Sequence, residues 1–282
     1  MKAILTHPGS AHKDDLLACS LLVAKHQVPV WRRDPSAEEL DDPSIAVVDV
    51  GGQHDPARKN FDHHQFPRDH EPVCALSLVL QDLELYDDAR SFCEWLEPAE
   101  WFDTRGPFAT ADWLGVDRGV MNQLNSPIDI TLLRRFAQKT EWQPGDPVWE
   151  IMKMIGEDLL MYLRTLRERI DYVAQHAEMK GVGEANEIRV LFMPRTDSMP
   201  DDPSSGLGRY VETLDETIHG LIYPDRRGEG YGLSRHDDSP HLDFTLIESE
   251  PDVHFAHARG FVAKTSATDI TRLLELVGKA RV

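Results

Sequence analysis

The sequence has few cysteines, fewer basic than acidic residues, and no long apolar run. Its three cysteines, Cys19, Cys74 and Cys93, are odd in number and form no Cys-x-x-Cys pair. This pattern favours neither a disulfide framework nor a thiolate zinc site, so we expect reduced cysteines in the core. No segment has the apolar length of a membrane span, and only three apolar residues stand between Lys2 and Thr6. We therefore expect a cytoplasmic protein without a membrane partner.

The sequence also has fewer basic than acidic residues. The chain has 30 Lys and Arg against 49 Asp and Glu, a formal net charge of −19 with neutral histidines, and both halves are acidic. Tight binding of long duplexes depends on a basic track, so a generic basic nucleic-acid binder is excluded. The remaining composition, 41% hydrophobic and 28% charged over 282 residues, is typical of a globular protein with one large or two ordinary domains.

The N-terminal part predicts an α/β fold. Ala3–Leu5 reads as a strand, Leu16–Lys25 as a helix, and Val28–Trp31 and Ile45–Val50 as further strands. The last strand is almost continuously apolar, which indicates burial on both faces of a parallel sheet. We therefore expect a parallel sheet flanked by helices.

The rest of the chain predicts helices followed by a smaller α+β domain. One long helix of about 146–180 starts at Asp146-Pro147, and its apolar residues follow steps of three and four. It can connect two domains or pair with a second subunit, and we expect domains of 1–180 and 181–282. The other expected helices are 73–85, 91–102, 130–138 and 269–279, and the expected C-terminal strands are 188–192, 220–223, 231–234, 242–247 and 254–258.

Three polar segments stand where predicted strands end. They are His7-x4-His12-x-Asp14-Asp15, Asp49-Val-Gly-Gly and Asp62-His63-His64. In open α/β sheets, ligands bind at the carboxyl ends of the strands, so these segments are expected to converge. Each also has a structural explanation: the first aspartates complement a helix dipole, Asp49 caps a turn, and the paired histidines lie in solvent.

The residue types favour metal binding. A buried carboxylate such as Asp49, at the end of an apolar strand, is costly unless it is paired or coordinates a cation. Imidazole and carboxylate without thiolate suit Mn²⁺, Zn²⁺ or Fe²⁺, and several carboxylates favour Mn²⁺ or Mg²⁺. Five or six ligands exceed the needs of one ion with an open position, but they fit two ions that share a carboxylate and promote phosphoryl transfer.

These motifs resemble a known family. The segments Thr6–Asp15, Val47–Pro56 and Phe61–Gln65 are similar to the melanocyte-proliferating-gene family of metal-dependent hydrolases, in the DHH phosphoesterase superfamily. Weaker similarity continues in Phe102-Asp103-x2-Gly106, Ile222–Asp225 and Phe255–Phe261. The resemblance implies a DHH-type catalytic domain, a smaller C-terminal substrate-binding domain, and activity as an exonuclease on RNA from the 3′ end.

The resemblance also implies roles for individual residues. One ion is held by His7, His12 and Asp49, and a second by Asp14, Asp49, His63 and Asp103, with Asp49 as the bridge. Asp62 and His64 are then the catalytic pair, because an imidazole near its ordinary pKa can protonate the leaving oxygen. The expected substrate contacts are His257, Arg259, Gly260 and Lys264.

Three functions remain open at this point. The first is a two-metal phosphoesterase, most simply with Mn²⁺ and alternatively with Mg²⁺ or Zn²⁺, that cleaves short or single-stranded nucleic acid. The second is a hydrolase of a small phosphorylated metabolite, such as pyrophosphate or a cyclic dinucleotide. The third is a metal-stabilised interaction protein without turnover, whose long helix forms a homodimer face. Motif specificity favours the enzymes.

Overall fold

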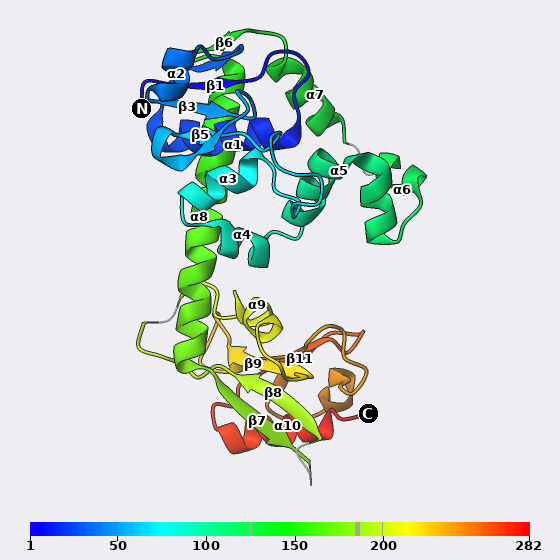
Figure 1. Ribbon diagram of the computed structural model, residues 1–282. Helices are drawn as coiled ribbons and strands as arrows, with labels where there is room; N and C mark the ends of the chain where they lie inside the picture. Colours follow the sequence, from blue (N-terminus) through cyan, green and yellow to red (C-terminus); the bar gives the residue numbers. More distant parts are fainter. Residues whose placement is uncertain (124–125, 184–186, 199) are drawn as a thin grey trace. The chain divides into compact units, whose positions relative to one another are not determined.

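The chain forms two compact units in the computed structural model, residues 1–164 and 165–282, and each contains its own sheet (Figure 1). The structure describes residues 1–123, 126–183, 187–198 and 200–282. The units divide inside helix α8 (Pro147–His176), earlier than the expected boundary near residue 180. The reason is that α8 supplies buried side chains to both, with Met152 and Leu163 in the first unit and Val173 in the second. The predicted α/β fold class is confirmed.

The N-terminal sheet has a parallel centre and antiparallel edges. Its strand order is β4-β5-β3-β1-β2-β6. The parallel strands are β1 (Ala3–Thr6), β2 (Val30–Arg32), β3 (Ile45–Val48) and β5 (Asn60–Phe61). The antiparallel edges are β4 (His54–Asp55) and β6 (Glu141–Trp142). Thr6 pairs with Val48, and Val48 with Phe61, so the carboxyl ends of three strands lie in one row.

Helices flank this sheet. Helix α1 (Lys13–His26) packs against β1, β3 and α3 (Ala75–Asp82), while Leu40 of α2 (Ala37–Asp41) packs with Leu5 and Val47. The remaining helices of the unit, before α8, are α4 (Tyr86–Phe92), α5 (Leu96–Leu114), α6 (Arg118–Gln123) and α7 (Pro127–Phe136). The sheet is therefore held between helices, as the uniformly apolar strands require.

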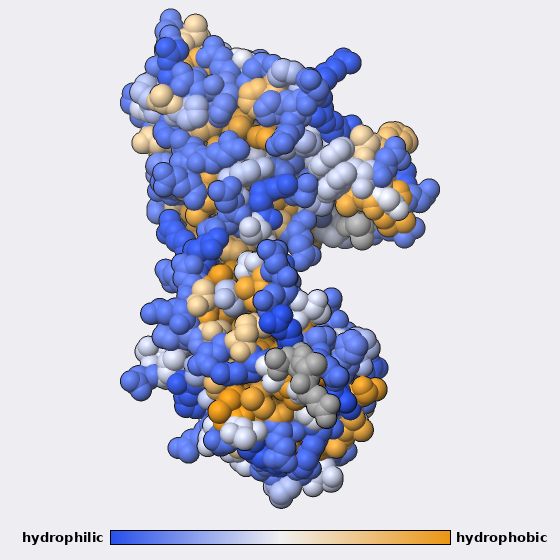
Figure 2. Space-filling model, turned by 60° about the horizontal axis from the view of Figure 1, so that its bottom comes forward, coloured by the Kyte–Doolittle hydropathy of each residue, from blue (hydrophilic) through white to orange (hydrophobic). Residues whose placement is uncertain are grey.

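Helix α5 departs from the expected helix of 91–102. The chain breaks at Cys93, restarts at Leu96, and kinks at Gly106, whose φ of 78° is a left-handed conformation that favours glycine. Apolar side chains are exposed on α5 and α6 and between them, and Figure 2 shows apolar surface on this part of the N-terminal unit. They include Phe102, Phe108, Trp113, Leu114, Val116 and Val120.

The C-terminal unit has a mostly antiparallel sheet in the order β11-β12-β10-β9-β8-β7. The strands are β7 (Glu178–Val182), β8 (Ile188–Phe192), β9 (Gly220–Pro224), β10 (Tyr231–Arg235), β11 (Val253–Ala256) and β12 (Val262–Thr265), and only the pair of β8 and β9 is parallel among those described. Helices α9 (Leu207–Glu212) and α10 (Ile270–Lys279) complete the unit. Ile222, Leu233 and Leu276 lie in its core.

Two sequence predictions in this unit are wrong. The expected long helix ends at His176, and residues 178–182 pair with β8 as strand β7 instead. The expected strand 242–247 contains a short 3₁₀-helix, Phe244–Ile247, whose first turn is capped by the Asp243 carboxylate. Phe244 and Ile247 are three residues apart and therefore share the buried face of such a helix. Strand β12 has no counterpart among the predicted strands.

No helix in the described part of the chain is long and apolar enough to cross a membrane.

A close contact between α1 and α8 gives the first prediction. A Cβ at Gly156 would lie 2.1 Å from the Ser20 carbonyl oxygen and 2.8 Å from the Ala24 Cβ. Gly→Ala inside a helix normally stabilises by about 0.5–1 kcal/mol. Here we expect Gly156→Ala to lower the free energy of unfolding by about 1–3 kcal/mol, because the helices must separate.

Urea unfolding of full-length protein measures this effect. Met154→Ala, at an exposed position of the same helix, is the control and is expected to change the free energy by less than about 0.5 kcal/mol. An unchanged or more stable Gly156→Ala protein would show that the two helices are not in tight contact.

Candidate metal centre

The six residues expected to hold metal come together at one edge of the N-terminal sheet. His7 follows β1, Asp49 follows β3, and His63 follows β5, so the aligned strand ends place them side by side. The start of α1 adds His12 and Asp14, and α5 adds Asp103. Asp49 has a φ of 57°, a left-handed conformation that aspartate tolerates better than most residues.

Among the described residues, the potential ligand atoms of these six and of His64 form three groups, in each of which all atoms lie within 4.8 Å of one another. Asp49 belongs to two groups, and so does His12. The groups are His7, His12 and Asp49; Asp49, His63 and His64; and His12, Asp14 and Asp103. The first group is the ligand set that the resemblance implies for one ion. The set implied for the second ion is divided, with Asp49 and His63 in one of the other groups and Asp14 and Asp103 in the other.

Asp14 is the most informative member. Its side chain is almost completely buried, and neither carboxylate oxygen has a hydrogen-bond donor among the described residues. Burial, together with the nearby carboxylates of Asp49 and Asp103, raises its pKa well above the usual range. An unpaired buried carboxylate is costly unless a cation compensates it. The donor set of carboxylates and imidazoles therefore fits a divalent cation.

His63 lies between two carboxylates. Its Nε2 is 3.1 Å from Asp49 Oδ1 and 3.0 Å from Asp103 Oδ2. Burial alone would lower its pKa, but the hydrogen bonds to Asp103 and Asp49 outweigh burial and raise it to about 10. The same burial raises the pKa of Asp49. Without a metal, a shared proton offsets this charge, and a divalent cation can replace it because imidazole nitrogens and carboxylate oxygens are atoms that bind such cations.

His7 is oriented by the backbone. Its Nδ1 lies 2.8 Å from the Pro8 carbonyl oxygen and donates there, so Nε2 is the ring nitrogen that faces the carboxylates. Nε2 is 3.1 Å from Asp15 Oδ2 and 3.5 Å from Asp49 Oδ2. The Asp15 hydrogen bond raises the pKa of His7. This tautomer leaves Nε2 available to a cation.

Arg32 and Asp15 support this loop, and the sequence assigns neither to the site. The fully buried Arg32 guanidinium donates through Nη2 to the carbonyl oxygens of His7 (3.1 Å), Gly9 (3.2 Å) and Ser10 (3.4 Å). Its Nη1 is 3.7 Å from Asp15 Oδ2, and Asp15 Oδ1 accepts from the His12 amide at 2.9 Å. The one sequence signal that could have pointed to Arg32 is its charge directly after the expected apolar strand 28–31.

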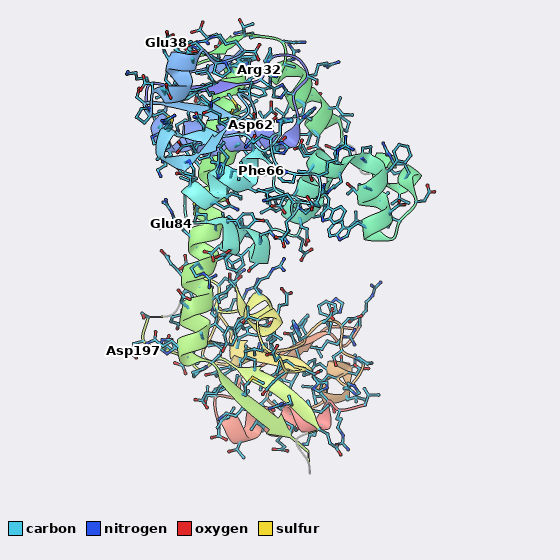
Figure 3. The ribbon with its side chains drawn as sticks, viewed as in Figure 1. Arg32, Glu38, Asp62, Phe66, Glu84 and Asp197 are labelled. Carbon is cyan, nitrogen blue, oxygen red and sulfur yellow. The ribbon has the colours of Figure 1, made fainter. Side chains whose placement is uncertain are left out.

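Asp62 and His64 form a hydrogen-bonded pair beside Asp49. Asp62 is buried and accepts the amides of Gly52 (2.6 Å) and His64 (3.0 Å), while His64 Nδ1 lies 2.7 Å from Asp62 Oδ1. The His64 side chain is 63% exposed. Because Nδ1 donates to Asp62, Nε2 is the ring nitrogen left for other contacts. Figure 3 labels Asp62 and Arg32 in the N-terminal unit.

Glu100 fixes the helix that carries Asp103, and sequence reasoning missed it. It lies one turn before Asp103, is buried, and accepts hydrogen bonds from three side chains. The donors are Ser77 Oγ (2.6 Å), the Tyr86 hydroxyl (2.8 Å) and Arg90 Nη1 (2.9 Å). This network ties α5 to α3 and α4. The sequence carried no signal for it, because the donors are scattered along the chain.

The four expected substrate contacts do not form one cluster. His257, Arg259 and Gly260 lie in the turn between β11 and β12, where the Arg259 amide donates to His257 Nδ1. Gly260 packs on Asp243, whose Oδ1 would lie 2.0 Å from an added Cβ. Lys264 instead pairs with Asp225 at 2.9 and 3.0 Å, and lines a cavity to which none of the other three contributes.

The sequence matches a protein family over part of its length. Residues 3–72 match the family model MYG1_exonuc, described as "Uncharacterised protein family (UPF0160)". This is the melanocyte-proliferating-gene family, and the matched segment contains all three motifs on which the resemblance is based. The resemblance is therefore confirmed for this part of the chain.

Individual relatives match the same region. The chain is 42% identical over 64 residues to the MYG1 exonuclease of Bos taurus, covering 21% of this chain and 16% of that protein. It is 38% identical over 68 residues to the MYG1 protein of Chlamydia muridarum, covering 23% of this chain and 22% of that protein. The match thus spans less than a quarter of either relative.

Two solved structures resemble the chain along nearly its whole length. One is the DHH domain of a protein described as a member of a family of ribosomal proteins, with a TM-score of 0.34, 16% identity, and coverage of 99% of this chain and 86% of that one. The other is a pGpG-specific phosphodiesterase from Vibrio cholerae, with a TM-score of 0.32, 13% identity, and coverage of 99% of both chains.

The unpaired state of Asp14 gives a prediction on stability. In EDTA, Asp14→Asn is expected to raise the free energy of unfolding by about 1–3 kcal/mol, because a buried carboxylate without a donor is removed. With Mn²⁺ the order reverses, since the wild-type protein gains binding free energy and the variant gains much less. Thermal unfolding at pH 7 with and without MnCl₂ measures both effects.

Asp112→Asn is the matched control, because Asp112 is exposed on α5 outside the three groups. It should follow the wild-type protein in both conditions. If Asp14→Asn is stabilised by Mn²⁺ as much as the wild type, or is less stable in EDTA, Asp14 is not a metal ligand.

Proposed function

We propose that this protein is a metal-dependent phosphoesterase that hydrolyses phosphodiester bonds in short or single-stranded nucleic acid, with RNA as the favoured substrate. The observation that supports the proposal is the buried Asp14, whose carboxylate has no donor among the described residues and lies where imidazoles and carboxylates converge. The name of the MYG1 exonucleases, which resemble residues 3–72, supports the same reaction class.

The residues that would hold the ions are those of the three groups other than His64, and Asp49 is the proposed bridge because its carboxylate has two oxygens, which can bind separate ions. Mn²⁺ is the preferred ion, since it accepts both imidazole nitrogen and several carboxylate oxygens. Bound divalent cations supply positive charge that attracts a phosphate group and offsets the charge developing on it in the transition state. Arg32 and Asp15 keep His7 and His12 in place.

The pair of Asp62 and His64 supplies the proton chemistry. The hydrogen bond from His64 Nδ1 to Asp62 fixes the ring, and Nε2 of this largely exposed side chain can donate a proton to the leaving oxygen. Asp62 itself is held by two backbone amides, so it orients the imidazole rather than contacting substrate. Catalysis by this pair requires His64 to cycle between its two protonation states.

The overall charge restricts the substrate. With a net charge of −19, the protein lacks the excess of basic residues that would bind a long duplex. Some of the acidic groups, including Asp14 and Asp49, lie in the candidate centre, where two divalent cations would offset them. The substrate is therefore held mainly at the metals, which favours short or single-stranded chains.

An end-labelled RNA ladder tests the proposed activity. With Mn²⁺, 5′-labelled single-stranded RNA is expected to shorten one nucleotide at a time, whereas 3′-labelled RNA releases labelled mononucleotide at once. EDTA should abolish both reactions. Hydrolysis of pyrophosphate or a cyclic dinucleotide without any action on RNA would favour the small-metabolite hypothesis. A metal-loaded protein that turns over none of these would favour the non-catalytic one.

A double-mutant cycle tests the catalytic pair. We expect His64→Gln to lower kcat by about 10²–10⁴-fold, the range of general acid catalysis. Asp62→Asn should lower kcat less, and the double variant should be no worse than His64→Gln alone, because Asp62 acts through His64. His26→Gln, at the far end of α1, is the control and should retain wild-type kcat.

Manganese content is measured on the same proteins. Retention of metal by His64→Gln is expected if the imidazole serves as the acid. Loss of metal to the level of Asp49→Asn would instead make His64 a ligand, and independent effects of the two substitutions on kcat would contradict the pairing.

A further inference from the structure

A cavity of about 450 Å³ lies at one end of the C-terminal sheet. It is formed by the β9–β10 turn, part of β11, and the last residues of β12, and its walls include Asp225, Arg227, His254, Phe255 and Lys264. The β11–β12 turn, which contains three of the expected substrate contacts, lies at the opposite end of β12. The volume is within the range of about 300–1,000 Å³ that is typical of small-molecule sites.

The β9–β10 turn is held in place by Arg195 and by β12. Arg195 Nη2 donates to the carbonyl oxygens of Asp225 (3.3 Å), Gly228 (2.8 Å) and Gly230 (3.2 Å). Gly230 lies directly against β12, because an added Cβ would come within 1.9 Å of the Thr265 carbonyl oxygen. The turn is therefore fixed in shape at this wall of the cavity.

The cavity wall carries charges of both signs, with Arg227 and Lys264 beside Asp225 and Glu229, and its cations can bind an anion. Asp225 is buried, and both its oxygens are paired with Lys264 Nζ, at 2.9 and 3.0 Å. An ammonium has three N–H donors, so at least one remains for a ligand. Arg227 has no ion-pair partner in the part of the chain described, although its amide donates to Asp225. His254 adds a further donor at the same wall.

An aromatic ring lies beside this charge. Phe255 on β11 lines the cavity, and its residue surface is 44% exposed. Exposed rings next to cationic groups stack the planar bases of nucleotides, and the phosphate is held by Arg or Lys. Glu229, also in the wall, can accept hydrogen bonds from sugar hydroxyls.

We propose that this cavity is a nucleoside monophosphate site, with the base on Phe255 and the phosphate at Arg227 and Lys264. The site belongs to the C-terminal unit alone, so the proposal does not rest on the phosphoesterase reaction of the N-terminal unit. It assigns a ligand-binding role to Arg227, His254 and Phe255, none of which is among the expected substrate contacts.

Calorimetry with full-length protein in EDTA tests the site, because chelation removes metal-dependent phosphate binding elsewhere. AMP is the probe, and inorganic phosphate and adenosine are its two halves. Wild-type protein should bind AMP at least tenfold more tightly than either half. Phe255→Ala and Arg227→Ala should each weaken AMP binding at least tenfold, whereas only Arg227→Ala should affect phosphate.

Matched controls exist for both variants. Phe261 is a similarly exposed phenylalanine of the same hairpin, and Arg226 is the exposed neighbour of Arg227; neither lines the cavity. Phe261→Ala and Arg226→Ala should bind AMP within twofold of wild type. Asp49→Asn should do so as well, because the metal centre is not involved.

Several results would overturn the proposal. They are absence of AMP binding at millimolar concentration, equal weakening by the control substitutions, loss of binding in Asp49→Asn, and equal affinity for AMP and either half. If AMP binds as expected while the RNA ladder stays intact, the proposed reaction fails and this site stands. If RNA is cleaved but AMP does not bind in EDTA, the proposed reaction stands and this site fails.

Discussion

The N-terminal unit is organised around buried negative charge at one edge of its sheet. Asp14, Asp15 and Asp49 are all withdrawn from water there, and so is most of Asp103. Bringing carboxylates together in this way opposes folding, because each raises the cost of ionising its neighbours. Arg32 and the histidines offset part of this charge. The oxygens of Asp14 accept no hydrogen bond among the described residues, and a cation is the simplest account of the cluster.

The architecture explains how residues far apart in sequence reach this edge. Parallel strands end in a common row, so each of three loops contributes one or two side chains, and α1 starts from the first of them. Asp103 is the exception, because it comes from a helix that does not follow a strand of this sheet. Its position depends on the hydrogen bonds of Glu100 to α3 and α4. The centre thus has a strand-based part and a separately anchored helical part.

The strand-based part could be predicted from sequence, and the supporting residues could not. Short apolar runs ending in His or Asp marked β1 and β3, because strand burial and polar termini leave a local pattern. Arg32 and Glu100 leave no such pattern, since their partners are backbone carbonyls and side chains brought close only by folding. Strands β4 and β5 have two residues each, and pairing rather than propensity defines them. The 3₁₀-helix at Phe244 was misread because the buried Leu242 and Phe244 are two residues apart, as in a strand, although Phe244 and Ile247 are three apart.

The separation into two units has a spectroscopic consequence. Every tryptophan of the chain, Trp31, Trp95, Trp101, Trp113, Trp142 and Trp149, lies within residues 1–164, and the C-terminal unit has none. Indole emission therefore reports on the unit with the candidate metal centre alone, whereas far-ultraviolet circular dichroism reports on both. Comparing the two signals during one unfolding experiment shows whether the shared helix α8 makes the units melt together or lets one outlast the other.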